Sequence, residues 1–250
     1  MDVELWPYEI SHANHRILDP LSDDKIALLG RVARLSTGQR LLDLGCGRGE
    51  MLCLWARDHG IGGLGIDLSV PQIGDARARA EQLGVADRVA FEQGDAGQVT
   101  WEPGTFDVAA CVGATWIGGS LPGTIGLLRP ALREEGGLLL VGEPFWKAEP
   151  TPGACEALGF GTEHVTDLSG LLDLFERENL ELVEMVLSDP DSWDRYEAQQ
   201  WWTTDEWLRA HPDDPRAPRM REFMTTHRRA HLQYQRHLLD WGVFVLRPRG

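Results

Sequence analysis

The sequence has few lysines, few cysteines and no long apolar run, and each shortage argues against a class of protein. Lys25 and Lys147 are its two lysines, and 24 basic residues stand against 39 acidic ones, so the net charge at pH 7 is −15. Nucleic-acid binding depends on neutralising phosphates with basic side chains, so we expect no nucleic acid partner. No segment approaches the roughly 20 apolar residues that span a bilayer, so we expect no membrane partner.

The four cysteines lack the spacing of a zinc site or a disulfide framework. They are Cys46, Cys53, Cys111 and Cys155, and no two of them form a C-x-x-C pair. We therefore expect no metal, and reduced thiols of the kind found in cytoplasmic proteins. The first residues include Asp2 and Glu4 rather than a basic stretch followed by an apolar run, so we expect no export signal and a cytoplasmic location.

A glycine-rich turn lies between Leu41 and Gly49, in the run Leu-Leu-Asp-Leu-Gly-Cys-Gly-Arg-Gly. An apolar strand leads into it and a helix follows, and glycine allows the left-handed backbone and close ligand approach that such a turn needs. A dinucleotide-binding fingerprint has its third glycine where this chain has Glu50. The spacing therefore disfavours NAD and points to another nucleotide-like cofactor.

The ends of three later strands carry residues suited to a nucleoside. Asp67 lies 24 residues after Asp43 (67 − 43), about where a ribose-binding acid stands in a βαβ unit. The strand expected over 88–92 is followed by Gly94-Asp95-Ala96, and the strand expected over 106–111 by Val112-Gly113-Ala114. Because parallel strands end at the same edge of a sheet, these loops should meet there.

These residues resemble the class I S-adenosylmethionine-dependent methyltransferases, whose motif I is a G-x-G-x-G turn preceded by an acid. The resemblance covers nearly the whole chain. It implies an α/β fold with a Rossmann-like, doubly wound sheet of seven strands, six parallel and the last antiparallel. It also implies S-adenosyl-L-methionine as cofactor and S-adenosyl-L-homocysteine as product. The cofactor-binding residues that follow from it are Asp43, Gly45, Cys46, Gly47, Gly49, Asp67, Leu68, Asp95, Ala96 and Cys111.

Apolar periodicity predicts helices near 22–35, 50–59, 69–83, 122–132 and 168–175, and further strands over 40–44, 137–142, 181–187 and 241–246. Thr203 and Glu206 predict a capping box that opens a short helix ending at Pro212. We expect a single methyltransferase domain over 1–250. Its parts would be an N-terminal cap (1–36), a cofactor-binding core (37–187), a helical lid (188–239) and the last strand (240–250).

Catalytic candidates are few. Glu143 follows the strand over 137–142, at the edge where the cofactor is expected. Its carboxylate could take a proton from the acceptor if burial raised its pKa towards neutrality. Otherwise it is a surface acid beside a proline. His12 and His15 are alternative bases, because imidazole exchanges protons near neutral pH, although isolated histidines are more often structural.

Aromatic side chains mark the expected acceptor site. The candidates are Trp116 and Trp146 from the strand-end loops, and Trp193, Arg195, Tyr196 and Trp201 from the segment between the last two strands. Trp193, Glu197 and Trp201 share one helical face. The rings suit a cationic amine or a flat apolar acceptor, so the acceptor atom stays open. Anchoring of the helix, or a dimer contact, explains the same aromatics, and monomer and homodimer both remain possible.

The sequence lacks residues that three subclasses of methyltransferase require. A metal-dependent O-methyltransferase would have acidic metal ligands after the fourth strand, where this chain has Cys-Val-Gly-Ala-Thr-Trp. Enzymes that methylate amino groups of nucleic acids have an Asn/Asp-Pro-Pro-Tyr/Phe motif after that strand, and Glu143-Pro144-Phe145-Trp146 departs from it. A cytosine-C5 enzyme has proline before its catalytic cysteine, whereas Ala110 precedes Cys111. The pattern looks like a bacterial small-molecule branch of the family. We therefore expect methyl transfer to an N, O, S or C nucleophile of a small molecule. The alternatives are a protein or RNA methyltransferase, or a binding module or enzyme of another reaction on the same fold.

Overall fold

The computed structural model describes residues 6–249 and divides the chain into two compact units. The core unit consists of Ser22–Glu143, Ser169–Leu187 and Trp241–Gly250. The helical unit consists of Met1–Leu21, Pro144–Leu168 and Ser188–Asp240. In the described part of the chain, no helix is long and apolar enough to cross a membrane.

The core unit is built around a seven-stranded sheet with the order β3-β2-β1-β4-β5-β7-β6. The strands are β1 (Arg40–Leu44), β2 (Gly62–Asp67), β3 (Val89–Gln93), β4 (Val108–Val112), β5 (Leu138–Trp146), β6 (Leu180–Leu187) and β7 (Leu239–Pro248). β1 pairs in parallel with β2 and β4, whereas β7 runs antiparallel to β6. Six parallel strands and one reversed strand confirm the fold expected from the sequence.

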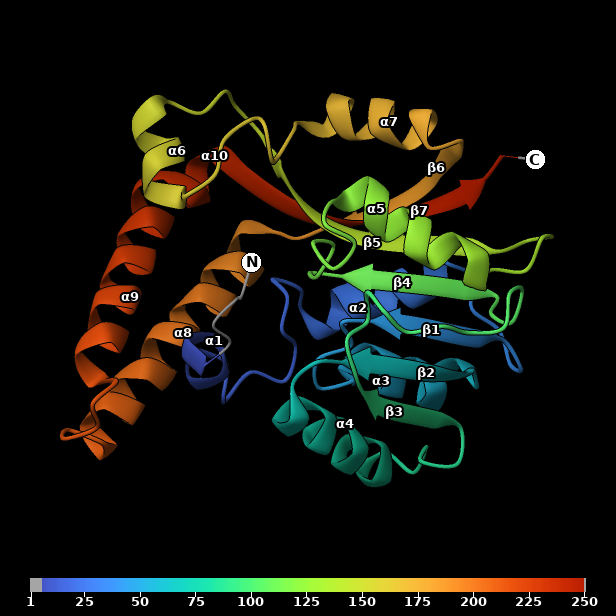
Figure 1. Ribbon diagram of the computed structural model, residues 1–250, viewed down its shortest axis with the longest axis horizontal. Coiled ribbons are helices and arrows are strands. Elements are labelled where there is room, and N and C mark those ends of the chain that lie inside the picture. Colours follow the sequence, from blue (N-terminus) through green and yellow to red (C-terminus); the bar gives the residue numbers. More distant parts are fainter. Residues whose placement is uncertain (1–5, 250) are drawn as a thin grey trace. The chain divides into compact units, whose positions relative to one another are not determined.

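Helices cover both faces of this sheet, which is why its central strands are apolar throughout. All five residues of β4 are buried. The helices of the core unit are α2 (Asp23–Val32), α3 (Glu50–His59), α4 (Val70–Gln82), α5 (Leu121–Leu128) and α7 (Leu168–Arg177). Figure 1 shows α5 in front of the sheet and α2 and α3 behind it. α2 begins where Ser22 Oγ accepts the backbone N–H of Lys25, and α3 begins directly at the glycine turn.

The helical unit contains α1 (Trp6–Ser11), α6 (Pro152–Leu158), α8 (Pro190–Ala210), α9 (Ala217–Ala230) and α10 (Arg236–Leu238), with a π-helical turn over His231–Gln235. α8 corrects the sequence analysis, because Thr203 and Glu206 lie inside this one helix and open no new one. Asp189 caps α8 by accepting the N–H of Ser192 at 2.8 Å. No glycine or internal proline interrupts the helix before Pro212, so the capping-box pattern had no helix end to stabilise.

β5 is longer than the sequence analysis expected. The prediction ended this strand at Gly142, with Glu143 and Trp146 in the following loop, but both residues belong to the strand. Beyond Pro144 the extended backbone finds new partners, because the N–H of Trp146 donates to Thr166 O at 2.9 Å. The alternation of apolar residues within 137–146 could not predict this pairing, because Thr166 lies twenty positions further along the chain.

Candidate functional site

The glycine turn between β1 and α3 adopts a backbone that only glycine accepts readily. Gly45, Gly47 and Gly49 have φ angles of 71°, 53° and 66°, all in the left-handed region. A Cβ on Gly45 would lie 2.6 Å from Cβ of Ala114, in the loop after β4. The turn is therefore a cradle whose backbone stays open to a ligand and packs directly on its neighbouring loop.

Asp67 links the end of β2 to this turn. Its Oδ2 accepts the N–H of Gly47 at 2.9 Å, and its Oδ1 accepts the N–H of Ser69 at the same distance. Burial raises the pKa of Asp67, although the backbone hydrogen bonds oppose that shift. Each oxygen keeps a second lone pair, so the carboxylate can accept two hydroxyls of a vicinal diol. Leu68 follows it with 49% of its surface exposed.

Asp43, at the end of β1, gives the site its electrostatic character. Its side chain is 3% exposed, and burial together with the negative charge of Asp67 raises its pKa to about 7. Burial also raises the pKa of Cys46, and Cys111 is fully buried in β4. Two close carboxylates favour a ligand that carries positive charge.

The loop after β3 places its two predicted residues differently. Asp95 is exposed, and its carboxylate closes its own turn by accepting the N–H of Gly97 at 2.9 Å and the Gln98 amide at 2.7 Å. Ala96 is buried. Asp95 therefore has a turn-forming role in the structure, and its adenine contact stays a prediction.

Glu143 lies within hydrogen-bonding contact of the loop after β4. The hydroxyl of Thr115 donates to Glu143 Oε1. Burial raises the pKa of Glu143 to about 7, and the hydrogen bond from Thr115 acts in the opposite direction. Ala114 and Thr115 are consecutive, so one loop contacts both the glycine turn and Glu143. Sequence reasoning missed Thr115, for which the only signal was its position at a strand end.

The two tryptophans expected near the acceptor differ in exposure. Trp116 is 57% exposed on the core unit, so its ring is available to a ligand. Trp146 is 4% exposed and packs in the helical unit, with its ring centre 5.7 Å from that of Phe160. Trp146 therefore has a packing role in this structure.

The two candidate histidines, His12 and His15, both contact Tyr196 in the helical unit. His12 Nε2 lies 2.8 Å from the Tyr196 hydroxyl, and His15 Nε2 lies 2.9 Å from its carbonyl oxygen. Burial raises the pKa of Tyr196 well above its ordinary value. The structure thus brings the two histidines and Tyr196 together as one hydrogen-bonded group.

The predicted helical face of Trp193, Glu197 and Trp201 lies on α8 and joins a polar cluster. Trp193 Nε1 donates to Glu197 Oε1 at 3.4 Å, and the Trp201 ring centre lies 5.9 Å from that of His231. His231 is fully buried, with Nε2 3.1 Å from Asp194 Oδ1. The pairing of Asp194 with His231 was not predicted from the sequence, because 37 residues separate the two.

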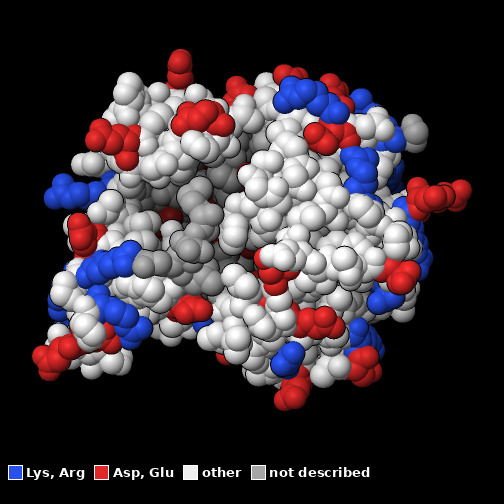
Figure 2. Space-filling model, in the orientation of Figure 1, with Lys and Arg blue, Asp and Glu red and all other residues white. Residues whose placement is uncertain are grey.

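Charged side chains are interspersed on the face in Figure 2, with basic and acidic groups next to one another. Several late arginines have acidic or aromatic neighbours: Arg216 lies 2.8 Å from Asp214, and Arg236 lies 2.9 Å from Asp194. The guanidinium carbon of Arg216 also lies 5.4 Å from the ring centre of Trp207. These contacts give the arginines structural roles.

The core-unit residues fit the nucleoside sulfonium that the resemblance implies. The glycine turn leaves room for backbone approach, Asp67 suits a ribose diol, and the acidic pair of Asp43 and Asp67 suits a cationic centre. The turn's own arginine, Arg48, lies 3.5 Å from Asp75 in an ion pair, so it is not a free counterion for a pyrophosphate.

Comparisons with known proteins agree with this geometry. A family model for a methyltransferase domain matches residues 35–205. The uncharacterized protein YjhP of Escherichia coli (strain K12) is 46% identical over 245 residues, covering 97% of this chain and 98% of that protein. A 27-O-demethylrifamycin SV methyltransferase of Amycolatopsis mediterranei (strain S699) is 35% identical over 128 residues, covering 49% of this chain and 44% of that protein. The crystal structure of a SAM-dependent methyltransferase from Geobacter sulfurreducens, in complex with S-adenosyl-L-homocysteine, has a TM-score of 0.93 and 48% identity, covering 98% of each chain.

Proposed function

Because the chain belongs to the S-adenosylmethionine-dependent methyltransferase family, we propose that it transfers the methyl group of that cofactor to a nucleophile of a small molecule. The observation that carries the proposal is the loop after β4, which contacts the glycine turn through Ala114 and Glu143 through Thr115. One loop thereby joins a donor cradle to a carboxylate with a pKa of about 7. The partial similarity to a 27-O-demethylrifamycin SV methyltransferase supports a small acceptor.

Asp67 and the glycine turn would hold the cofactor. The two carboxylate oxygens of Asp67 would accept the ribose hydroxyls while they fix Gly47 and Ser69. Asp43 would favour the positive charge of the sulfonium. Gly45, Cys46, Gly49, Leu68, Ala96 and Cys111 would line this site, and Asp95 would meet the base. When bound, the cofactor supplies an activated methyl group, so the protein has mainly to position a nucleophile and exclude water.

Glu143 would act on the acceptor. A carboxylate with a pKa near the working pH can take up the proton of an attacking hydroxyl or ammonium group. Thr115 orients it through the hydrogen bond to Oε1. His12 and His15 are less suited, because a nitrogen of each ring already contacts Tyr196. We assign these histidines the role of positioning Tyr196, and Trp116 the role of an acceptor-facing aromatic.

Labelling with methyl-labelled cofactor in a metabolite extract tests the proposal. We expect label in a small organic product. Glu143→Gln should slow the labelling about 100-fold or more, while calorimetry shows unchanged affinity for S-adenosyl-L-homocysteine. The matched control is Glu156→Gln, which changes an exposed acid on α6 of the helical unit. Label found only in protein or RNA would contradict a small acceptor.

A further inference from the structure

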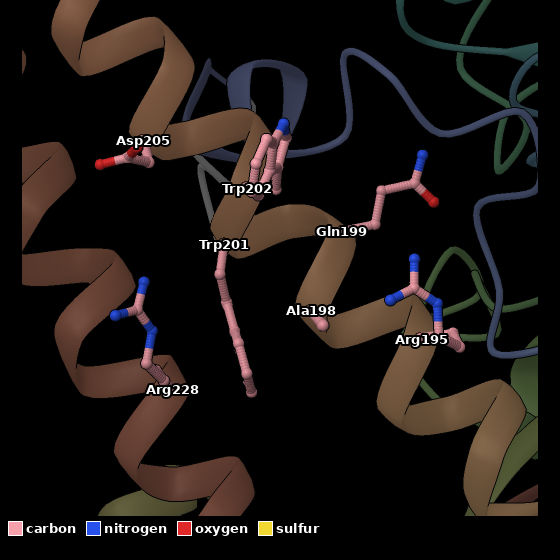
Figure 3. A pocket seen from close by; sticks show the side chains of 7 residues that line it. All are labelled: Arg195, Ala198, Gln199, Trp201, Trp202, Asp205 and Arg228. Atoms are coloured by element: carbon pink, nitrogen blue, oxygen red, sulfur yellow. The ribbon is translucent and has the colours of Figure 1, made fainter.

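A cavity of about 780 Å³ is lined by α8 and α9 of the helical unit, but its charged groups do not converge. Figure 3 shows Trp201 between the two arginines of the wall, Arg195 and Arg228. The Arg228 guanidinium carbon lies 5.3 Å from the Trp201 ring centre, so this arginine is already engaged with an indole. Converging polar groups are found instead in the core unit, on the loop after β4.

The loop after β4, residues 113–120, is held at Thr115 by two separate hydrogen bonds. The hydroxyl of Thr115 donates to Glu143 Oε1. The carbonyl oxygen of Thr115 accepts the hydroxyl of Thr124 at 2.6 Å. Thr124 lies in α5 and is fully buried, and Thr115 is 9% exposed. A buried hydroxyl thus holds the backbone of the residue whose side chain contacts Glu143.

Thr124 holds the same loop at a second position. Its Oγ1 accepts the N–H of Gly118 at 3.0 Å, so the hydroxyl is used both as donor and as acceptor. A Cβ on Gly123 would overlap the carbonyl oxygen of Gly118, because the loop lies directly against the first turn of α5. Ser120 caps this helix by accepting the N–H of Gly123 at 3.2 Å. The loop and the start of α5 therefore form one closely packed structure.

We propose that Thr124 is a positioning residue for Glu143 and that it acts through Thr115. The role of Glu143 as a base rests on the proposed function. Thr124 fixes the backbone of Thr115, and the backbone decides which side-chain rotamer of Thr115 is favoured. The hydroxyl of Thr115 is thereby kept on Glu143, as hydrogen bonds behind a site hold the groups in front of them.

The electrostatics of Glu143 make this arrangement measurable. Burial raises the pKa of Glu143 to about 7, and the hydrogen bond from Thr115 lowers it. Within residues 6–249, Glu143 forms no ion pair. A weaker contact with Thr115 should therefore raise the pKa of Glu143 further, because the charged form loses its hydrogen-bond donor.

Titration of Glu143 by carbon-13 NMR, on the full chain labelled at glutamate Cδ, tests the proposal. The signal of Glu143 is identified by its absence in Glu143→Gln. Thr115→Val removes the hydrogen bond and should move the midpoint upward by about one pH unit. Thr124→Val should move it upward by about half a pH unit, because Thr115 then contacts the carboxylate for only part of the time. Thr124→Ser keeps the hydroxyl and should titrate as the wild type does.

A double-mutant cycle shows whether Thr124 acts through Thr115. In the Thr115→Val background, Thr124→Val should move the midpoint no further, because the contact it supports is already gone. The matched control is Thr37→Val, which removes an exposed hydroxyl that donates to His59 O at 3.2 Å elsewhere in the core unit. This control should leave the midpoint of Glu143 unchanged.

Three results would each overturn the proposal: an unmoved midpoint in Thr124→Val, an equal shift in Thr124→Ser, or an undiminished shift in the Thr115→Val background. Cooperative thermal unfolding of every variant establishes that the core unit is folded. If Thr124→Val lacks it, Thr124→Cys takes its place, because a thiol is a weak donor and should move the midpoint in the same direction. The titration needs no methyl transfer. Unchanged labelling by Glu143→Gln would therefore refute the base role of Glu143 and leave the effect of Thr124 on this carboxyl group standing.

Discussion

Replacement of Asp67 should separate cofactor binding from support of the glycine turn. The carboxylate accepts N–H groups of Gly47 and Ser69 at 2.9 Å, one on each oxygen. Each oxygen retains one lone pair for a ribose hydroxyl. Asp67→Ala removes both functions, whereas Asp67→Asn keeps the shape of the side chain and one acceptor oxygen.

The expected loss follows from those two hydroxyl contacts. A hydrogen bond to a charged group contributes about 1.5–3 kcal/mol, so two contribute about 3–6 kcal/mol. Asp67→Ala should therefore lower the affinity for S-adenosyl-L-homocysteine by at least about 100-fold, and Asp67→Asn should lower it about tenfold. Burial raises the pKa of Asp67. As pH is lowered, protonation of Asp67 should therefore reduce the cofactor affinity of the wild type at a higher pH than the ordinary pKa of an exposed aspartate would give.

Isothermal calorimetry with S-adenosyl-L-homocysteine measures these affinities, and thermal unfolding of the unliganded protein reports on the turn. Asp58→Asn is the matched control, because Asp58 is an exposed acid of the core unit paired with Arg57 at 2.6 Å. A lower melting temperature with affinity within threefold of the wild type would refute the ribose role. It would leave Asp67 as a support of the turn alone.

Four further substitutions test the remaining steps. Because burial raises the pKa of Glu143 to about 7, the wild-type rate should rise with pH around that value as the carboxyl group loses its proton. Glu143→Gln should lower turnover about 100-fold or more and remove that rise, and a rise that persists in the variant would exclude Glu143 as the base. Thr115→Val removes a hydrogen bond that lowers the pKa of Glu143, so the midpoint of that rise should move to higher pH, and an unmoved midpoint would contradict the contact. Gly45→Ala places a Cβ 2.6 Å from a neighbouring Cβ at a φ of 71°, so unfolding free energy should fall by about 1–3 kcal/mol, as denaturant titration can check. Burial raises the pKa of Glu197, so its folded form holds a proton that the unfolded chain releases; wild-type stability should fall as pH rises above the ordinary glutamate pKa, and Glu197→Gln should reduce that slope in thermal scans.

The parts of the fold that were predicted well depend on local chemistry. β1 and α3 have the bounds expected from the sequence, because the glycine turn between them forces the backbone to change direction at fixed positions. Left-handed φ angles at three glycines are a local property that the spacing reveals. The sheet of seven strands, with six parallel and one reversed, was expected from the family resemblance and was confirmed.

The parts that were not predicted depend on distant partners. The extension of β5 to Trp146 requires Thr166, and the orientation of Glu143 requires Thr115, 28 residues away. The pairing of Asp194 with His231 likewise joins two helices. Thr203 and Glu206 lie inside α8 and not at a helix start, because a capping sequence within a helix looks the same as one at its beginning. Only the absence of a break before Pro212 distinguishes the two cases.

The division of the chain has a consequence for protein engineering. The helical unit is assembled from three separate stretches, and the backbone passes between the units five times. Removing residues 188–239 would therefore delete one stretch and leave the other two without their packing partner, so the helical unit cannot be removed as a module. A chimaera that exchanges the helical unit for that of a relative must transplant all three stretches together, and one splice point falls at the peptide bond after Glu143.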